Sequence, residues 1–201
     1  MASIYFIPNS LNVAIDEDAR DKCGESAARL LTYMATLLEL EQRGVLDRLD
    51  PGLPFDVQER RLIYVSPRLR DWLQGPLLGL VGEGELSPAE QLADMLERFC
   101  SGETLRIGPH LNVLNPVRRP GAAGQAAWKL KTYDARIFGW FARRDVFVGV
   151  SGHPAAHVKK HRLYPALADE VVRFRDGLDL DPPKFIPGEN PYGVVSNYDP
   201  G

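Results

Sequence analysis

The longest apolar pattern in the chain recurs at helical spacing near the N-terminus. Residues 17–44 carry apolar side chains three and four positions apart, which form one broad stripe: Ala27, Leu30, Leu31, Met34, Leu37 and Leu38. Asp16 or Asp18 can cap this helix, and Gly44 can end it. Because a stripe this wide is costly to leave in water, we expect the helix to dock on the rest of the chain or to pair in a homodimer.

Three further helices are predicted from their first turns. A serine followed by a proline predicts a helix over 67–74, because proline fits the first helical position. Ser87 and Glu90 have the spacing of a capping box, which predicts a second helix that ends at Gly102. Residues 164–178 combine helical spacing with a proline in the first turn and predict a closing helix.

Short apolar runs, and in one case alternation of apolar and polar residues, predict strands in the middle of the chain. Residues 60–66 predict one strand, and 135–152 predict a hairpin that turns at Arg143–Asp145. The strand that begins at residue 128 has two distinct faces. Its alternating sides are Trp128, Leu130 and Thr132 against Lys129, Lys131 and Tyr133.

The order of these elements predicts an α+β fold, with an antiparallel sheet and helices packed on one face. The Pro/Gly-rich connector 47–56 is the expected domain boundary. We therefore expect an N-terminal helical extension over 1–56, an α+β domain over 57–180, and a Pro/Gly-rich tail over 181–201.

Composition narrows the class of protein. The 201 residues are 44% hydrophobic and 25% charged, which is typical of a globular protein. No apolar stretch approaches a membrane span, and the N-terminus lacks the basic region of a secretion signal, so we expect a cytoplasmic protein without a membrane partner. Cys23 and Cys100 lie far apart and predict two free thiols.

The net charge of −3 conceals a strongly basic middle segment. Residues 97–163 hold twelve Lys and Arg against four Asp and Glu, a net charge of +8. Residues 1–96 hold nine against sixteen, and residues 164–201 hold three against seven, so both ends are acidic. This asymmetry predicts a polyanion-binding site in the middle of the chain, which the acidic ends can shield.

The basic segment contains the candidate site residues. Lys129, Lys131 and Arg136 can neutralise phosphate, although the outer face of a solvated strand has the same pattern. Lys159 and Lys160 form a candidate phosphate clamp on charge alone.

Two further side chains could take part in chemistry. His153 follows a glycine at a strand end and can serve as general acid or base, or be an ordinary loop histidine. Tyr164 stands before the proline that starts a helix, where a hydrophobic staple is the simpler reading.

The sequence predicts neither a metal nor a cofactor. His157 and His161 have a spacing that suits a metal on a helix, but no carboxylate or cysteine lies beside them to complete the ligand set. The phosphate-binding loop, the dinucleotide-binding fingerprint, the nucleophile elbow and the paired-cysteine zinc pattern are all missing from the sequence.

Four stretches together resemble the RelE/ParE toxin superfamily, and more closely its HigB-like, phage-derived branch. They are "RRLIYVSPRLRDWLQ", "LERFCSGETLRIGPHLNVL", "WKLKTYDARIFGWF" and "FVGVSGHPAAHVKKHRLYPALADEVVRFRDGL". The likeness spans about residues 60–178 and rests on the order and texture of the elements. The first 55 residues have no counterpart in the small toxins.

The resemblance implies a bacterial or prophage-encoded endoribonuclease that cuts messenger RNA at the ribosome without metal, and an antitoxin as protein partner. By position it implies catalytic roles for Arg136, His153 and Lys159, with His153 or a lysine taking the 2′-hydroxyl proton. It further implies RNA contacts from the remaining candidates: Lys129, Lys131, Lys160 and Tyr164. The alternative is a non-catalytic binding or regulatory protein on the same fold, which the acidic N-terminal helix favours.

Overall fold

The computed structural model describes residues 5–6, 36–114 and 126–199. Their main feature is a seven-stranded mixed sheet. In spatial order its strands are β1 (Tyr5–Phe6), β2 (Asp47–Asp50), β3 (Leu62–Val65), β8 (Val146–Pro154), β7 (Ala135–Arg143), β6 (Trp128–Lys131) and β5 (Leu111–Val113). A second, two-stranded sheet pairs β4 (Leu105–Arg106) with β9 (Tyr198–Asp199).

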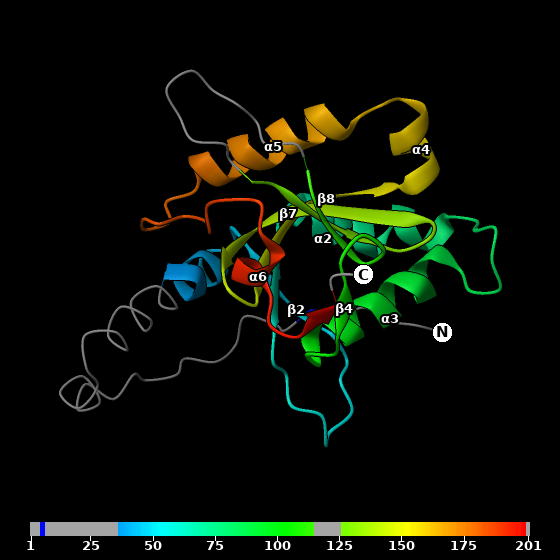
Figure 1. The fold of residues 1–201 in the computed structure, drawn as a ribbon, viewed down its shortest axis with the longest axis horizontal. Helices are drawn as coiled ribbons and strands as arrows, with labels where there is room; N and C mark the ends of the chain where they lie inside the picture. The colour runs from blue at the N-terminus through cyan, green and yellow to red at the C-terminus, as the bar shows by residue number, and fades with distance from the viewer. Residues whose placement is uncertain (1–4, 7–35, 115–125, 200–201) are drawn as a thin grey trace.

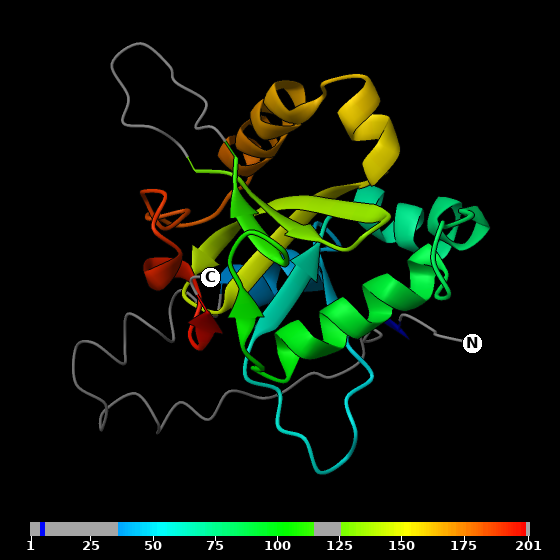
Figure 2. The same ribbon diagram turned by 45° about the vertical axis from the view of Figure 1, so that its right-hand side comes forward.

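Helices cover both faces of the large sheet. On one face lie α2 (Pro67–Gln74) and α3 (Pro88–Cys100), and on the other lie α4 (Ala155–Lys160) and α5 (Tyr164–Gly177) (Figures 1 and 2). The expectation of helices on one face is therefore wrong. The reason lies in β7 and β8, which are buried at nearly every position, so that neither face of the sheet can be left in water.

One strand pair departs from the antiparallel arrangement. β3 runs parallel to β8, with Leu62 opposite Val146 and Val65 opposite Gly149, whereas the other neighbours in the large sheet are antiparallel. The expected α+β class holds, but the expectation of a wholly antiparallel sheet is wrong at this pair. Nothing in the local alternation of β3 distinguishes a parallel from an antiparallel neighbour.

The helix starts confirm the capping signals of the sequence. The Ser66 side chain accepts a hydrogen bond from the Leu69 amide at 3.1 Å, and α2 ends at Gln74 as expected. Ser87 and Glu90 form both halves of a capping box at the start of α3. These bonds satisfy amides that the first helical turn leaves without partners.

Several segments that were expected to be irregular are ordered elements. Residues 47–50 of the expected connector form β2, because Leu49 is buried under the sheet and Asp47 pairs with Val65. After β8, residues 155–160 form the short helix α4, which was not predicted from the sequence. In the Pro/Gly-rich tail, α6 (Pro191–Val194) precedes β9, and its last residue is buried.

Of the residues 17–44 that were predicted to form a helix, the structure describes only those from 36 onward. Residues 36–42 are helical, and the chain leaves the helix at Gly44, whose φ of +68° favours glycine. Leu37 and Leu40 are fully buried in the cluster beneath α5, so this end is docked on the sheet. The apolar stripe up to Met34, and with it Cys23 and the expected homodimer surface, lies outside the described residues. Within the described ranges no helix is long and apolar enough to cross a membrane.

Candidate nucleic-acid interface

Three basic candidates form a row across neighbouring strands. Lys131 on β6 is opposite Arg136 on β7, and Arg136 is opposite His153 on β8. Directly opposite residues of antiparallel strands share a face, so these side chains are neighbours on the α5 side of the sheet. The structure thus brings together positions that are 22 residues apart in the sequence.

Arg136 organises the turn between β6 and β7. Its side chain is only 5% exposed, and its Nη1 donates to the carbonyl oxygens of Ala135 at 2.7 Å, Tyr133 at 3.5 Å and Thr132. Its Nε is buried and has no hydrogen-bond partner. Burial lowers the pKa of Arg136, and a hydrogen bond with the Tyr164 hydroxyl opposes that shift. One edge of the guanidinium is therefore committed to the turn.

Lys129 lies two residues before Lys131 on the same face of β6. Its Nζ is 4.3 Å from the centre of the Tyr164 ring, which is a cation–π contact. Burial, together with the neighbouring Lys131 and Arg136, lowers the pKa of Lys129 to about 8. No ion pair with a carboxylate is found for Lys129 among the described residues. An amine of this kind is partly uncharged near neutral pH and can accept a proton.

The His153 side chain is more buried than its position at a strand end predicts. Its ring meets Phe138 edge-on with 6.0 Å between centres, and its Nε2 is buried without a partner. Burial, with the nearby Arg68 and His157, lowers the pKa of His153, which favours the uncharged imidazole. It has the protonation state of a general base, but Nε2 does not open to solvent.

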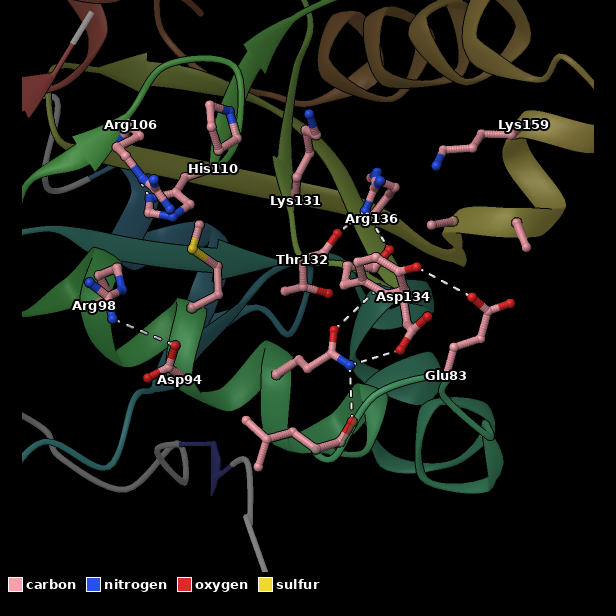
Figure 3. Close-up of a pocket in the computed structure, with 17 residues that line it drawn as sticks. Glu83, Asp94, Arg98, Arg106, His110, Lys131, Thr132, Asp134, Arg136 and Lys159 are labelled. Carbon is pink, nitrogen blue, oxygen red and sulfur yellow. Dashed lines mark hydrogen bonds and ion pairs between the residues drawn. The ribbon is translucent and has the colours of Figure 1, made fainter. Parts of the chain in front are cut away.

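A cleft of about 650 Å³ lies beside this row, between α3, the β6–β7 turn and α4. Three basic side chains from three different elements line it: Lys131, Arg136 and Lys159 (Figure 3). Lys159 extends from α4 toward Arg136, and within the described ranges none of the three is ion-paired with a carboxylate. Burial, followed by the like charges of Arg136 and Lys159, lowers the pKa of Lys131.

The other end of the cleft carries basic residues that sequence reasoning missed. Arg98, Arg106 and His110 line it. The positive charge of Arg98 is balanced by two carboxylates, since its guanidinium lies 3.0 Å from Glu103 and 3.8 Å from Asp94. The signal that could have found them is the charge count, because the basic segment begins at residue 97.

The remaining candidates do not line the cleft. Lys160 is exposed and does not line the cleft, although it is the next residue after Lys159. Tyr164, Lys129 and His153 form a second group, under α5, which Arg136 joins to the cleft.

His157 in α4 and His161 at the C-cap of α4 are neighbours. Their rings are tilted by 45° to each other, with 4.6 Å between the ring centres. The part of the chain that the structure describes has no group of three or more His, Cys, Asp or Glu residues that could hold a metal ion.

Comparison of the chain with protein-family models, with curated proteins and with solved structures finds no match.

Proposed function

We propose that the protein binds RNA in this cleft and cuts its phosphodiester backbone, as the resemblance to the HigB-like branch of the RelE/ParE toxins implies. One observation supports this most: Lys131, Arg136 and Lys159 converge on one cleft without an ion-paired carboxylate among the described residues. Positive charges that repel one another around a cleft are stabilised by a bound polyanion.

The side chains around the cleft suit a cleavage that uses the substrate's own 2′-hydroxyl. In this reaction a base takes the 2′-proton, the 2′-oxygen bonds to the adjacent phosphorus, and the bond from phosphorus to the 5′-oxygen breaks. The leaving 5′-oxygen takes up a proton, and the products are a 2′,3′-cyclic phosphate and a 5′-hydroxyl. Positive side chains stabilise the negative charge that grows on the phosphate.

We propose Lys129 as the base, although it lies beside the cleft, against the Tyr164 ring, and does not line it. With a pKa of about 8, roughly a tenth of the molecules carry it uncharged at pH 7. It lies on the same strand face as Lys131, which together with Lys159 would hold the phosphate. The His153 imidazole is the other candidate, but its Nε2 would have to become exposed first.

The burial of His153 and the cover of Tyr164 over Lys129 favour a second candidate function. In this alternative the same fold binds RNA or regulates another protein without cutting RNA. Binding without cleavage is its signature.

The two functions are separated by Lys129→Arg, which keeps the positive charge but cannot lose its proton near neutral pH. RNA is incubated with excess chelator, and its ends are analysed for 2′,3′-cyclic phosphate. We expect cleavage by the unaltered protein, and a loss of about a hundredfold or more in the variant with little change in RNA binding. Equal cleavage by both proteins would contradict the role of Lys129. Binding without cleavage in the unaltered protein would select the second function, and no binding at all would refute both RNA functions.

The cellular part of the proposal is that messenger RNA is the target and that an antitoxin protein restrains the activity. Induced expression in bacteria should then stop growth, and the Lys129→Arg protein should be harmless at the same level. Harmless expression of the unaltered protein would contradict a toxin role.

A further inference from the structure

Tyr133 stands at the tip of the β6–β7 turn, between the two cleft residues Lys131 and Arg136. It lines the cleft, yet 68% of its surface is exposed. Leu86, another exposed apolar side chain, lines the same cleft. An aromatic ring that is left in water beside basic side chains presents a free π-face where a nucleotide's base would lie.

The turn that carries this ring is held firmly in place. Arg136 donates to the carbonyl oxygens of the turn, including that of Tyr133 at 3.5 Å. The Tyr133 hydroxyl lies 3.3 Å from a carboxylate oxygen of Glu83, to which it donates a hydrogen bond.

The residue that follows is tied to helix α3 on two sides. The Asp134 carboxylate accepts from the Gln91 side chain at 2.7 Å, and the Asp134 amide donates to the same side chain at 3.2 Å. A ring on a fixed turn loses little conformational entropy when a ligand binds, so little of the contact's binding free energy is offset.

We propose that Tyr133 stacks on an unpaired base of the bound strand, and that this contact makes the cleft specific for single-stranded RNA. The proposal rests on the RNA function proposed above and adds the substrate class to it. In a duplex the faces of the bases are covered by their neighbours, whereas in a single strand they are free to stack on an aromatic side chain.

Stacking and charge neutralisation can be separated by their dependence on salt. A phosphate contact from Lys131 or Lys159 releases counterions, so its contribution to affinity falls as the salt concentration rises. A base stacked on Tyr133 releases none. Loss of the ring should therefore weaken binding by a similar factor at every salt concentration and leave the slope against salt unchanged.

The test compares three probes on the full-length protein. The first is a short oligoadenylate whose 2′-O-methyl groups block cleavage, the second is its duplex with oligouridylate, and the third is inorganic polyphosphate, a polyanion without bases. Tyr133→Ala removes the ring, and Tyr133→Phe keeps the ring but loses the hydroxyl. Phe55→Ala is the matched control, because Phe55 is a fully exposed aromatic residue outside the cleft.

We expect Tyr133→Ala to weaken binding of the single strand about fivefold to a hundredfold and to leave polyphosphate binding unchanged. Tyr133→Phe and Phe55→Ala should bind the single strand within about twofold of the unaltered protein. The unaltered protein should prefer the single strand to the duplex.

Three results would overturn the proposal while leaving RNA binding itself in place. They are unchanged binding of the single strand by Tyr133→Ala, an equal loss of polyphosphate binding in that variant, and equal affinity of the unaltered protein for strand and duplex. An unaltered protein that binds neither polyphosphate nor RNA would refute the RNA function together with the stacking contact.

Discussion

Replacing Arg61 with methionine should destabilise the protein more than the loss of any exposed ion pair. Arg61 stands just before β3 and is 0% exposed. Its guanidinium lies 3.2 Å from the Asp145 carboxylate and above the ring of Phe99. It also donates to backbone carbonyl oxygens from two other segments: Phe99 (3.1 Å), Glu103 (2.9 Å), Asn197 (3.0 Å) and Ser196. One side chain thus joins the end of α3, the β7–β8 turn and the C-terminal segment.

The size of the effect follows from what the substitution leaves behind. Methionine fills much of the space but donates no hydrogen bond, so the carbonyl oxygens and Asp145 lose the bonds that Arg61 makes to them, although Phe99 and Asn197 keep backbone bonds from Gly102 and Leu105. Breaking a buried ion pair costs about 3–5 kcal/mol of unfolding free energy. The Asp145 side chain is 21% exposed and keeps its hydrogen bond from the Ser196 amide at 2.7 Å. Because Asp145 stays partly solvated, we expect a loss of unfolding free energy at the lower end of this range, about 3 kcal/mol. For a chain of this length that corresponds to a fall of about 6–12 °C in Tm.

The assay is urea denaturation followed by circular dichroism, together with limited proteolysis of the C-terminal segment. Arg43→Met is the matched control, because Arg43 lies 3.6 Å from Asp179 in an exposed pair worth at most about 1 kcal/mol. A loss below about 1 kcal/mol for Arg61→Met, or equal losses in the two variants, would refute the reasoning.

Three other predictions concern buried groups. The pKa of Lys129 is about 8 in the folded chain and 10.5 ordinarily, so between pH 8 and pH 10.5 the unfolded state binds more protons than the folded state. The free energy of unfolding should therefore rise with pH across this range, and Lys129→Met should remove the rise. Identical urea denaturation curves across the range would contradict this prediction. Gly152→Ala should lower the free energy of unfolding by about 1–3 kcal/mol, because the new methyl group would lie 2.1 Å from the Trp72 ring. Gly84→Ala is the control and should leave the free energy of unfolding nearly unchanged, because nothing lies within 4 Å of its methyl group. Equal effects of the two substitutions in a denaturation experiment would refute the packing argument. Burial raises the pKa of the Cys100 thiol, so an alkylating reagent should label it only after unfolding, and labelling of the native protein, detected by peptide mass spectrometry, would contradict this.

Elements with local signals could be predicted from the sequence. Helix α2 was predicted with its bounds because a serine cap and a proline mark its start. The hairpin of β7 and β8 was predicted because its strands are long and apolar and the turn between them is polar. Such signals depend on neighbours within a few residues, which the sequence shows directly.

Features that depend on distant parts of the chain could not be predicted. The parallel pairing of β3 with β8 joins residues more than 80 positions apart. Arg136 heads an apolar strand in the sequence, and only the folded turn shows that part of its guanidinium holds backbone carbonyl oxygens. Lys159 and Lys160 are equivalent in the sequence, but successive helical residues point about 100° apart, so α4 turns Lys159 alone into the cleft.

That difference between adjacent lysines gives the most direct test of the cleft as an RNA-binding site. RNA affinity is titrated at several salt concentrations for the unaltered protein, Lys159→Ala and Lys160→Ala, which differ from each other only in which of two neighbouring charges is lost. We predict that Lys159→Ala weakens binding and lowers the slope of log affinity against log salt by about 0.7, while Lys160→Ala leaves the slope unchanged. Equal slopes for the two variants, or no RNA binding by the unaltered protein at low salt, would contradict the account.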